Sequence, residues 1–90
     1  MLHMKDKIKL ASDLGPAIKA ARTQLGLKAI HIARDSGRSR NVLHRLERGE
    51  DVEVSSLFDI LRAMNLCIRL ESCGLPTMEE MAARFGGDDA

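Results

Sequence analysis

Three glycines, at positions 26, 37 and 49, divide the first half of the chain into short segments whose apolar residues recur at helical spacing. Glycine readily adopts the left-handed backbone conformation that ends many helices, so each of these positions predicts a helix end. A serine able to cap a helix precedes the first and the third segment. The pattern therefore predicts three short helices, between Ser12 and Gly26, from Lys28 to Ser36, and between Ser39 and Gly49.

Beyond Gly49 the pattern predicts a fourth helix, a strand and a fifth helix. Apolar residues keep helical spacing over Val52–Met64 and then alternate with other residues over Leu66–Glu71, as in a strand. Thr77–Phe85 combines a capping-box spacing with a narrow apolar stripe, which we expect to pack on the core, with partner binding as the alternative. A chain of 90 residues has room for one domain, so the expected fold class is all-α, with five helices and one short C-terminal strand.

The two halves of the chain carry opposite charge. Residues 1–49 hold 11 Lys or Arg against 4 acids, a net charge of +7, whereas residues 50–90 hold 3 against 9, a net charge of −6. A strongly basic half favours contact with a polyanion, and the acidic half favours a different partner.

Composition argues against several classes of protein. The most apolar stretch, Leu57–Leu70, is interrupted by three charged residues, so we expect no membrane span. The first ten residues lack the features of a secretory signal, and we expect a cytoplasmic protein. Cys67 and Cys73 form neither a disulfide framework nor a metal site with the few histidines present, and both are expected to be reduced.

Nothing in the chain predicts an enzyme. His3, His31 and His44 lie far apart in the sequence, and neither a nucleophile motif nor a phosphate-cradling glycine loop is present. We therefore expect no catalytic residue, no cofactor and no metal.

The third expected helix has a polar face suited to DNA. Its polar residues share one side at positions i, i+3, i+4 and i+7, and Leu43 and Leu46 point away from them. Arginine can bond bidentately to guanine and asparagine to adenine, while cations neutralise phosphate. A merely solvated face is the alternative for such a stripe, and the preceding short helix and glycine turn favour a helix-turn-helix. The residues of the stripe are Asn41, His44, Arg45 and Arg48.

Several motifs in register resemble the lambda-repressor and Cro type of helix-turn-helix, the XRE family. The resemblance covers roughly residues 14–66 and implies a lambda-repressor-like DNA-binding domain. It is carried by Arg22, Leu25-Gly26-Leu27, Ile32, Ala33, Ser36-Gly37-Arg38-Ser39, Leu43, and Leu46-Glu47-Arg48-Gly49.

The resemblance also implies roles for individual residues. An Arg22–Glu47 ion pair would join the first and third helices at the margin of the core. Ala29 and Arg38 depart from the family pattern, and the acids Glu50, Asp51 and Glu53 should repel phosphate in a loop that commonly approaches DNA. The implied base-reading residues are Arg40, Asn41, His44 and Arg45, and the implied phosphate contacts are Lys28, Arg38, Ser39 and Arg48.

A lone strand needs a partner for its backbone groups. Lys7–Leu10 also alternates and could pair within the chain, but we favour pairing between two copies through Leu66, Ile68 and Leu70. The segments 57–61 and 66–70 resemble the HipB antitoxin branch of the XRE family, in which the terminal strand joins two protomers.

The sequence thus predicts a homodimeric regulator of transcription that binds double-stranded DNA. The simplest form is a repressor on an inverted-repeat operator. A more specific form of the same prediction is an antitoxin that represses its own operon and also binds a toxin. The alternative is a protein–protein interaction module on a helix-turn-helix scaffold without specific DNA binding. We expect an N-terminal arm at 1–11, the helix-turn-helix domain at 12–66, and the dimerisation strand, short C-terminal helix and frayed tail at 67–90.

Overall fold

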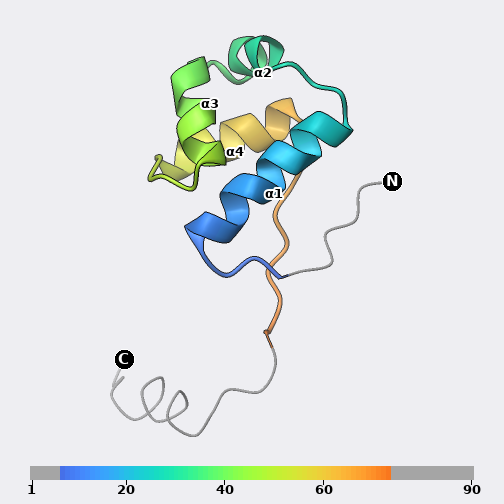
Figure 1. Ribbon diagram of the computed structural model, residues 1–90, viewed down its shortest axis with the longest axis vertical. Coiled ribbons are helices and arrows are strands. Elements are labelled where there is room, and N and C mark those ends of the chain that lie inside the picture. The colour runs from blue at the N-terminus through green and yellow to red at the C-terminus, as the bar shows by residue number, and fades with distance from the viewer. Residues whose placement is uncertain (1–6, 74–90) are drawn as a thin grey trace, which may run out of the picture.

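A computed structural model describes residues 7–73, which contain four helices (Figure 1). The four helices expected in this part of the chain are confirmed. The fifth, expected over Thr77–Phe85, lies outside the described residues. The helices are α1 (Ala11–Gln24), α2 (Ala29–Ser36), α3 (Arg40–Glu47) and α4 (Val54–Ala63).

The helix ends follow local chemistry, with one departure from the sequence prediction. Ser39 caps α3, since its Oγ accepts the backbone N–H of Val42 at 3.2 Å. The N-cap predicted at Ser12 is wrong, because α1 begins earlier and Leu10 holds that position. The Asp13 carboxylate, at the third position of the helix, accepts the backbone N–H groups of Leu10 at 3.1 Å and Lys9 at 3.2 Å, as the acidic residue of a capping box does.

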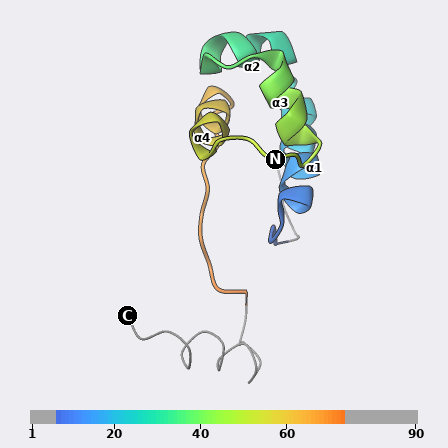
Figure 2. The same ribbon diagram turned by 90° about the vertical axis from the view of Figure 1, so that its left-hand side faces the viewer.

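Apolar side chains from all four helices form one core. In this core α1 packs against α3, and α2 packs against both α3 and α4 (Figures 1 and 2). Ile30 and Phe58 lie outside this core and remain 56% and 47% exposed. The buried apolar residues are Ile18, Ala21, Ile32, Leu43, Leu46, Ile60, Leu61 and Met64.

Gly15 allows α1 to approach the end of α3 closely. A Cβ atom at this position would lie 2.6 Å from the Glu47 carbonyl oxygen and 2.7 Å from the Gly49 nitrogen. Both are backbone atoms, so no side-chain rotation could relieve the overlap. The glycine therefore fixes the distance between these two helices.

The strand expected at Leu66–Glu71 is not formed within the described residues. After α4 the chain runs alongside α1 and past its N-terminal end without regular secondary structure (Figures 1 and 2). Lys7 contacts this segment through its side chain, with Nζ 3.2 Å from the Ser72 carbonyl oxygen and 3.8 Å from Glu71. No backbone ladder joins Lys7–Leu10 to it in the described part of the chain. A strand requires hydrogen-bonded pairing, which residues 7–73 of a single copy do not supply.

Within residues 7–73, none of the helices has the length and apolar character that a bilayer-spanning helix needs.

Candidate nucleic-acid interface

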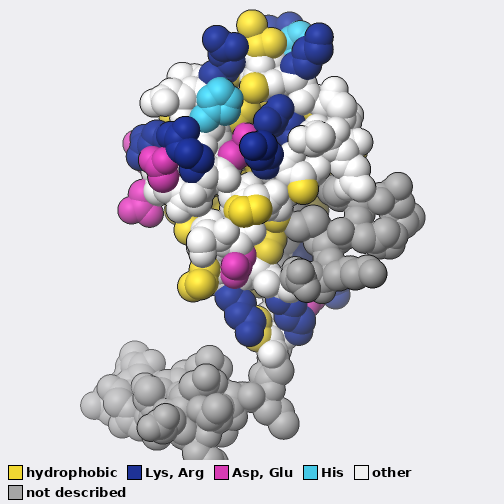
Figure 3. All heavy atoms as spheres, in the orientation of Figure 1, with side chains coloured by type: hydrophobic (Ala, Val, Ile, Leu, Met, Phe, Trp, Pro, Cys, Tyr) yellow, Lys and Arg dark blue, Asp and Glu magenta, His cyan; other side chains and the backbone are white. Residues whose placement is uncertain are grey.

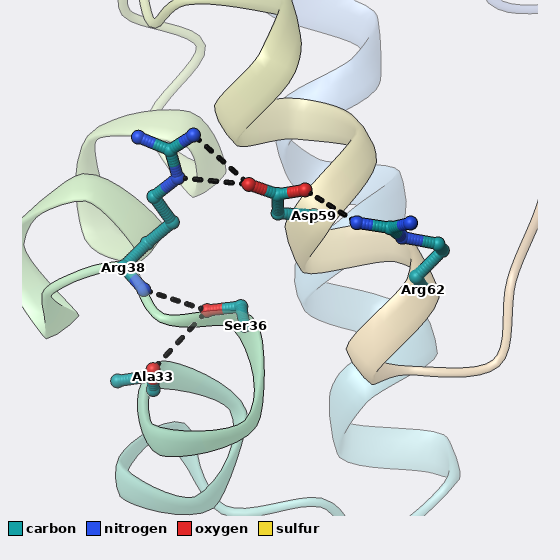
Figure 4. A network of polar contacts seen from close by, with 5 residues as sticks. All are labelled: Ala33, Ser36, Arg38, Asp59 and Arg62. Atoms are coloured by element: carbon teal, nitrogen blue, oxygen red, sulfur yellow. Dashed lines mark hydrogen bonds and ion pairs between the residues drawn. The ribbon is translucent and has the colours of Figure 1, made fainter.

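A tight turn joins α2 to α3 and sets the angle between them. Gly37 ends α2 in the left-handed conformation, with φ 73°. The Ser36 hydroxyl donates to the Ala33 carbonyl and accepts the Arg38 backbone N–H, both at 3.2 Å (Figure 4). Together with the Ser39 cap, these bonds form a helix-turn-helix in which α3 is the second helix.

The two faces of α3 have different surroundings. Leu43 and Leu46 are buried in the core. Arg40, Asn41 and His44 are exposed, and among the described residues none makes a hydrogen bond or ion pair with their side chains. Three side chains with base-reading chemistry therefore face outward from a rigid helix.

Arg45 and Arg48 lie at the same surface, but the following loop holds both. The Arg45 Nη2 donates to the Asp51 carbonyl oxygen at 2.6 Å, and its Nε lies 3.8 Å from a Glu50 carboxylate oxygen. The Arg48 Nε donates to the other Glu50 oxygen at 2.5 Å. The hydrogen bond from Arg48 is the main reason that the pKa of Glu50 lies below its ordinary value.

The start of α2 provides a second feature suited to an anion. Lys28 occupies the N-cap position and is exposed, and no side chain caps the helix there. Exposed N–H groups and the helix dipole favour negative charge at such an end. Lys, Arg and His side chains gather over the end of the molecule formed by α2 and α3 (Figure 3).

Arg38 is turned toward α4 and not toward the α3 surface. Its Nε and Nη2 donate to the Asp59 Oδ2 at 3.0 and 2.9 Å, and Arg62 donates to the Oδ1 at 2.7 Å (Figure 4). The phosphate contact predicted for Arg38 would require it to leave Asp59. These bonds, that of Arg38 above all, lower the pKa of Asp59.

Asp59 was not among the site residues expected from the sequence. The available signal was Arg38 itself, a cation at a turn position where an aliphatic side chain is usual in the family that the chain resembles. A partly buried cation at such a position is stabilised by a nearby carboxylate, and α4 carries one, Asp59.

Arg22 and Glu47 form a two-point ion pair between α1 and α3. The Arg22 Nε lies 2.6 Å from Glu47 Oε2, and its Nη2 lies 3.2 Å from Oε1. The side chains are 18% and 6% exposed, so the pair lies at the margin of the core, where the sequence placed it. The hydrogen bond to Glu47 raises the pKa of Arg22. The pair holds the C-terminal end of α3 against α1.

The residues expected to pair two copies are only partly covered. Leu66 packs against the core, whereas Ile68 is 42% and Leu70 is 91% exposed. Ile68 and Leu70 line a largely apolar groove of about 380 Å³ between α1 and the segment that follows α4.

The described residues thus bring the four predicted base-reading side chains onto one helix and place Lys28 at the start of the neighbouring helix. They contain no group of three His, Cys, Asp or Glu side chains able to hold a metal ion.

Comparisons with known proteins give matches among solved structures only. No protein-family model matches the chain, and no curated protein matches it. A HipB variant solved as a complex with the O2 20mer aligns with a TM-score of 0.73 and 22% identity over 79% of this chain and 100% of that one. HipB in the O4 20mer complex and in the HipA-HipB-O2-O3 complex each align with a TM-score of 0.72 and 23% identity over 77% of this chain and 99% of the other. The chain therefore has the fold of HipB, the XRE-like helix-turn-helix fold that its sequence motifs resemble.

Proposed function

We propose that the protein is a sequence-specific DNA-binding regulator of transcription, acting in the cytoplasm as a homodimeric repressor on an inverted-repeat operator. The observation that carries the proposal is the outward face of α3, where Arg40, Asn41 and His44 are exposed without a partner among the described residues. Leu43 and Leu46 are buried on the opposite face, so this face of the helix stays turned outward.

The chemistry of this face suits the major groove, which admits an α-helix and presents a distinct donor and acceptor pattern for each base pair. Arg40 and Arg45 are the proposed guanine readers, Asn41 the adenine reader, and His44 their neighbour. Lys28 at the start of α2 is the proposed principal phosphate contact. Ser39 and Arg48, at the two ends of α3, are further proposed phosphate contacts.

Dimerisation completes the proposal, because two recognition helices about 34 Å apart would read two half-sites on one face of the duplex. The exposed Ile68 and Leu70, beside an apolar groove, support pairing of two copies through the segment that follows α4.

The antitoxin variant adds a second partner. HipB has been solved together with HipA, which favours a toxin partner for a chain of the same fold. Residues 50–90 carry a net charge of −6, and we propose that this half, rather than the basic half, meets the toxin.

Selection of duplexes from a randomised pool tests DNA binding directly. The proposal expects an inverted repeat with half-sites one helical turn apart and an affinity that falls steeply with added salt. Recovery of no preferred sequence, together with no salt-dependent binding to any duplex, would refute it.

One observation favours a second function, a protein–protein interaction module without specific DNA binding. The Glu50 carboxylate already pairs with Arg45 and Arg48, which leaves less positive charge for DNA at the end of α3. The same selection discriminates the two functions, because an interaction module shows no site preference.

A further inference from the structure

Glu50 is held in place beside two arginines that face the proposed DNA surface. Its backbone N–H donates to the Arg45 carbonyl oxygen at 2.9 Å, which fixes where the residue leaves the end of α3. Its carboxylate then receives the Arg48 Nε at 2.5 Å and lies 3.8 Å from the Arg45 Nε. The contact therefore follows from the backbone of the loop and not only from the choice of side-chain rotamer.

These contacts use guanidinium groups that a duplex would also use. Carboxylate and phosphate oxygens accept the same charge-assisted hydrogen bonds from arginine. Glu50 is charged at neutral pH, as an ordinary glutamate is, and the hydrogen bond from Arg48 lowers its pKa further. Glu50 thus occupies the Arg48 Nε, a donor that the proposed phosphate contact would also use.

The pair is weak enough for exchange. The Arg48 and Glu50 side chains are 59% and 47% exposed, and solvent-exposed ion pairs contribute little to stability. A phosphate can therefore displace Glu50 from Arg48, but the gain from that contact is reduced by the loss of the internal pair.

We infer that Glu50 is an internal competitor for DNA phosphate, which lowers the affinity of the protein for DNA of any sequence. The inference rests on the proposed function. Its physical basis is that phosphate neutralisation supplies nearly all of sequence-independent binding, so an arginine neutralised within the protein contributes less to that binding. The duplexes that remain bound are then those that also satisfy the base-reading side chains.

The first test measures binding of the full chain to a mixed-sequence duplex. Glu50→Gln should bind about fivefold more tightly than wild type near physiological salt. The slope of the logarithm of the binding constant against the logarithm of the salt concentration should also be steeper by about one unit, the contribution of one additional cation. Glu53→Gln is the matched control, because Glu53 is exposed in the same loop and its side chain has no partner among the described residues. An equal gain in both variants would show that only net charge matters and would overturn the inference.

The second test identifies Arg48 as the group that Glu50 occupies. Arg48→Gln should weaken binding to the mixed-sequence duplex only slightly in wild type, but about fivefold in the Glu50→Gln background, where no carboxylate neutralises Arg48. Equal losses in the two backgrounds would mean that Glu50 repels phosphate without occupying Arg48, contrary to the inference.

Duplexes selected by the wild-type protein separate this inference from the proposed function. If wild type prefers a selected sequence while Glu50→Gln and Glu53→Gln behave alike, the inference alone fails. If neither wild type nor any variant binds a duplex, the proposed function fails and the inference fails with it.

Discussion

The α-carbon of Gly15 faces the backbone of Glu47 so closely that a methyl group on the glycine would lie 2.6 Å from the Glu47 carbonyl oxygen. The same Glu47 directs its carboxylate to Arg22, which lies about two turns beyond Gly15 on α1. Backbone contact and ion pair act on the same end of α3. Together they set the position of the proposed recognition helix relative to the rest of the domain.

Gly15→Ala should destabilise the fold by about 1–3 kcal/mol, the usual range for forcing an extra carbon into a packed site. Helix propensity alone predicts the opposite sign, a gain of roughly 0.5–1 kcal/mol from removing a glycine inside a helix. The free energy of unfolding in urea measures the change. The exposed Ala20→Gly on α1 calibrates the propensity contribution, and a stabilised Gly15→Ala variant would show that α1 and α3 do not meet as described.

Arg22→Met should cost about 3–5 kcal/mol, because it leaves the buried Glu47 carboxylate without its partner. Replacing both residues, as Arg22→Met with Glu47→Gln, should recover much of that loss, since the unpaired charge is gone. Urea unfolding of the two single variants and the double variant gives the coupling. Independent, additive losses would contradict the ion pair.

The sequence predicted these helices well because their signals are local. Gly37 and Ser39 each mark a helix end through their own backbone or hydroxyl chemistry, and the structure shows both acting there. Likewise, helical spacing alone is enough to put Leu43 and Asn41 on opposite faces of α3. Such features require no knowledge of which helix packs against which.

Several features that depend on a distant neighbour were missed or misplaced, whereas the Arg22–Glu47 pair, 25 residues apart, was expected through the family resemblance. From the sequence alone, Gly15 is a glycine that destabilises its own helix, because the close approach of the α3 backbone cannot be foreseen. The partner of Arg38 is Asp59, 21 residues away, and no periodicity connects the two. The strand expected at Leu66–Glu71 failed for the same reason. An alternating pattern indicates that a segment can form a strand, but it does not show which other segment pairs with it.

The ion pairs of Asp59 should make the free energy of unfolding decrease as the pH is lowered into the acid range. Hydrogen bonds from Arg38 and Arg62 lower its pKa in the folded protein below the ordinary value of 3.8. The unfolded state therefore takes up its proton first, and the stabilisation, fully present above about pH 3.8, is lost as the pH falls through the folded pKa.

Urea unfolding at a series of pH values checks this dependence. Asp59→Asn should be less stable than wild type at neutral pH, and the difference should shrink as the pH falls below 3.8. Asp35→Asn, which removes a carboxylate from an exposed pair with Arg34, controls for the loss of one surface charge. A difference between wild type and Asp59→Asn that stays constant across the acid range would contradict the bonding at Asp59.

The base-reading face predicts position-specific losses on DNA. Asn41→Ala or Arg45→Ala should cost about 1–3 kcal/mol at one position of the selected operator, with the fold intact. Fluorescence anisotropy against a panel of single base-pair changes measures the loss, and Arg62→Ala on α4 controls for removal of a cation away from α3. Unchanged site preference in both α3 variants would reject their reading role.

The exposed apolar side chains beyond α4 predict that dimerisation and DNA binding fail together. Lysine at Ile68 or Leu70 places a charge where two copies are proposed to meet, and desolvating that charge in an apolar contact is unfavourable. Ile68→Lys or Leu70→Lys should therefore shift sedimentation toward the monomer and weaken operator binding, because each half-site is then read alone. Val54→Lys makes the same kind of exchange at an exposed apolar position on α4 and should change neither property. If Ile68→Lys and Leu70→Lys both retain a dimer with wild-type operator affinity, the two copies must associate through another surface.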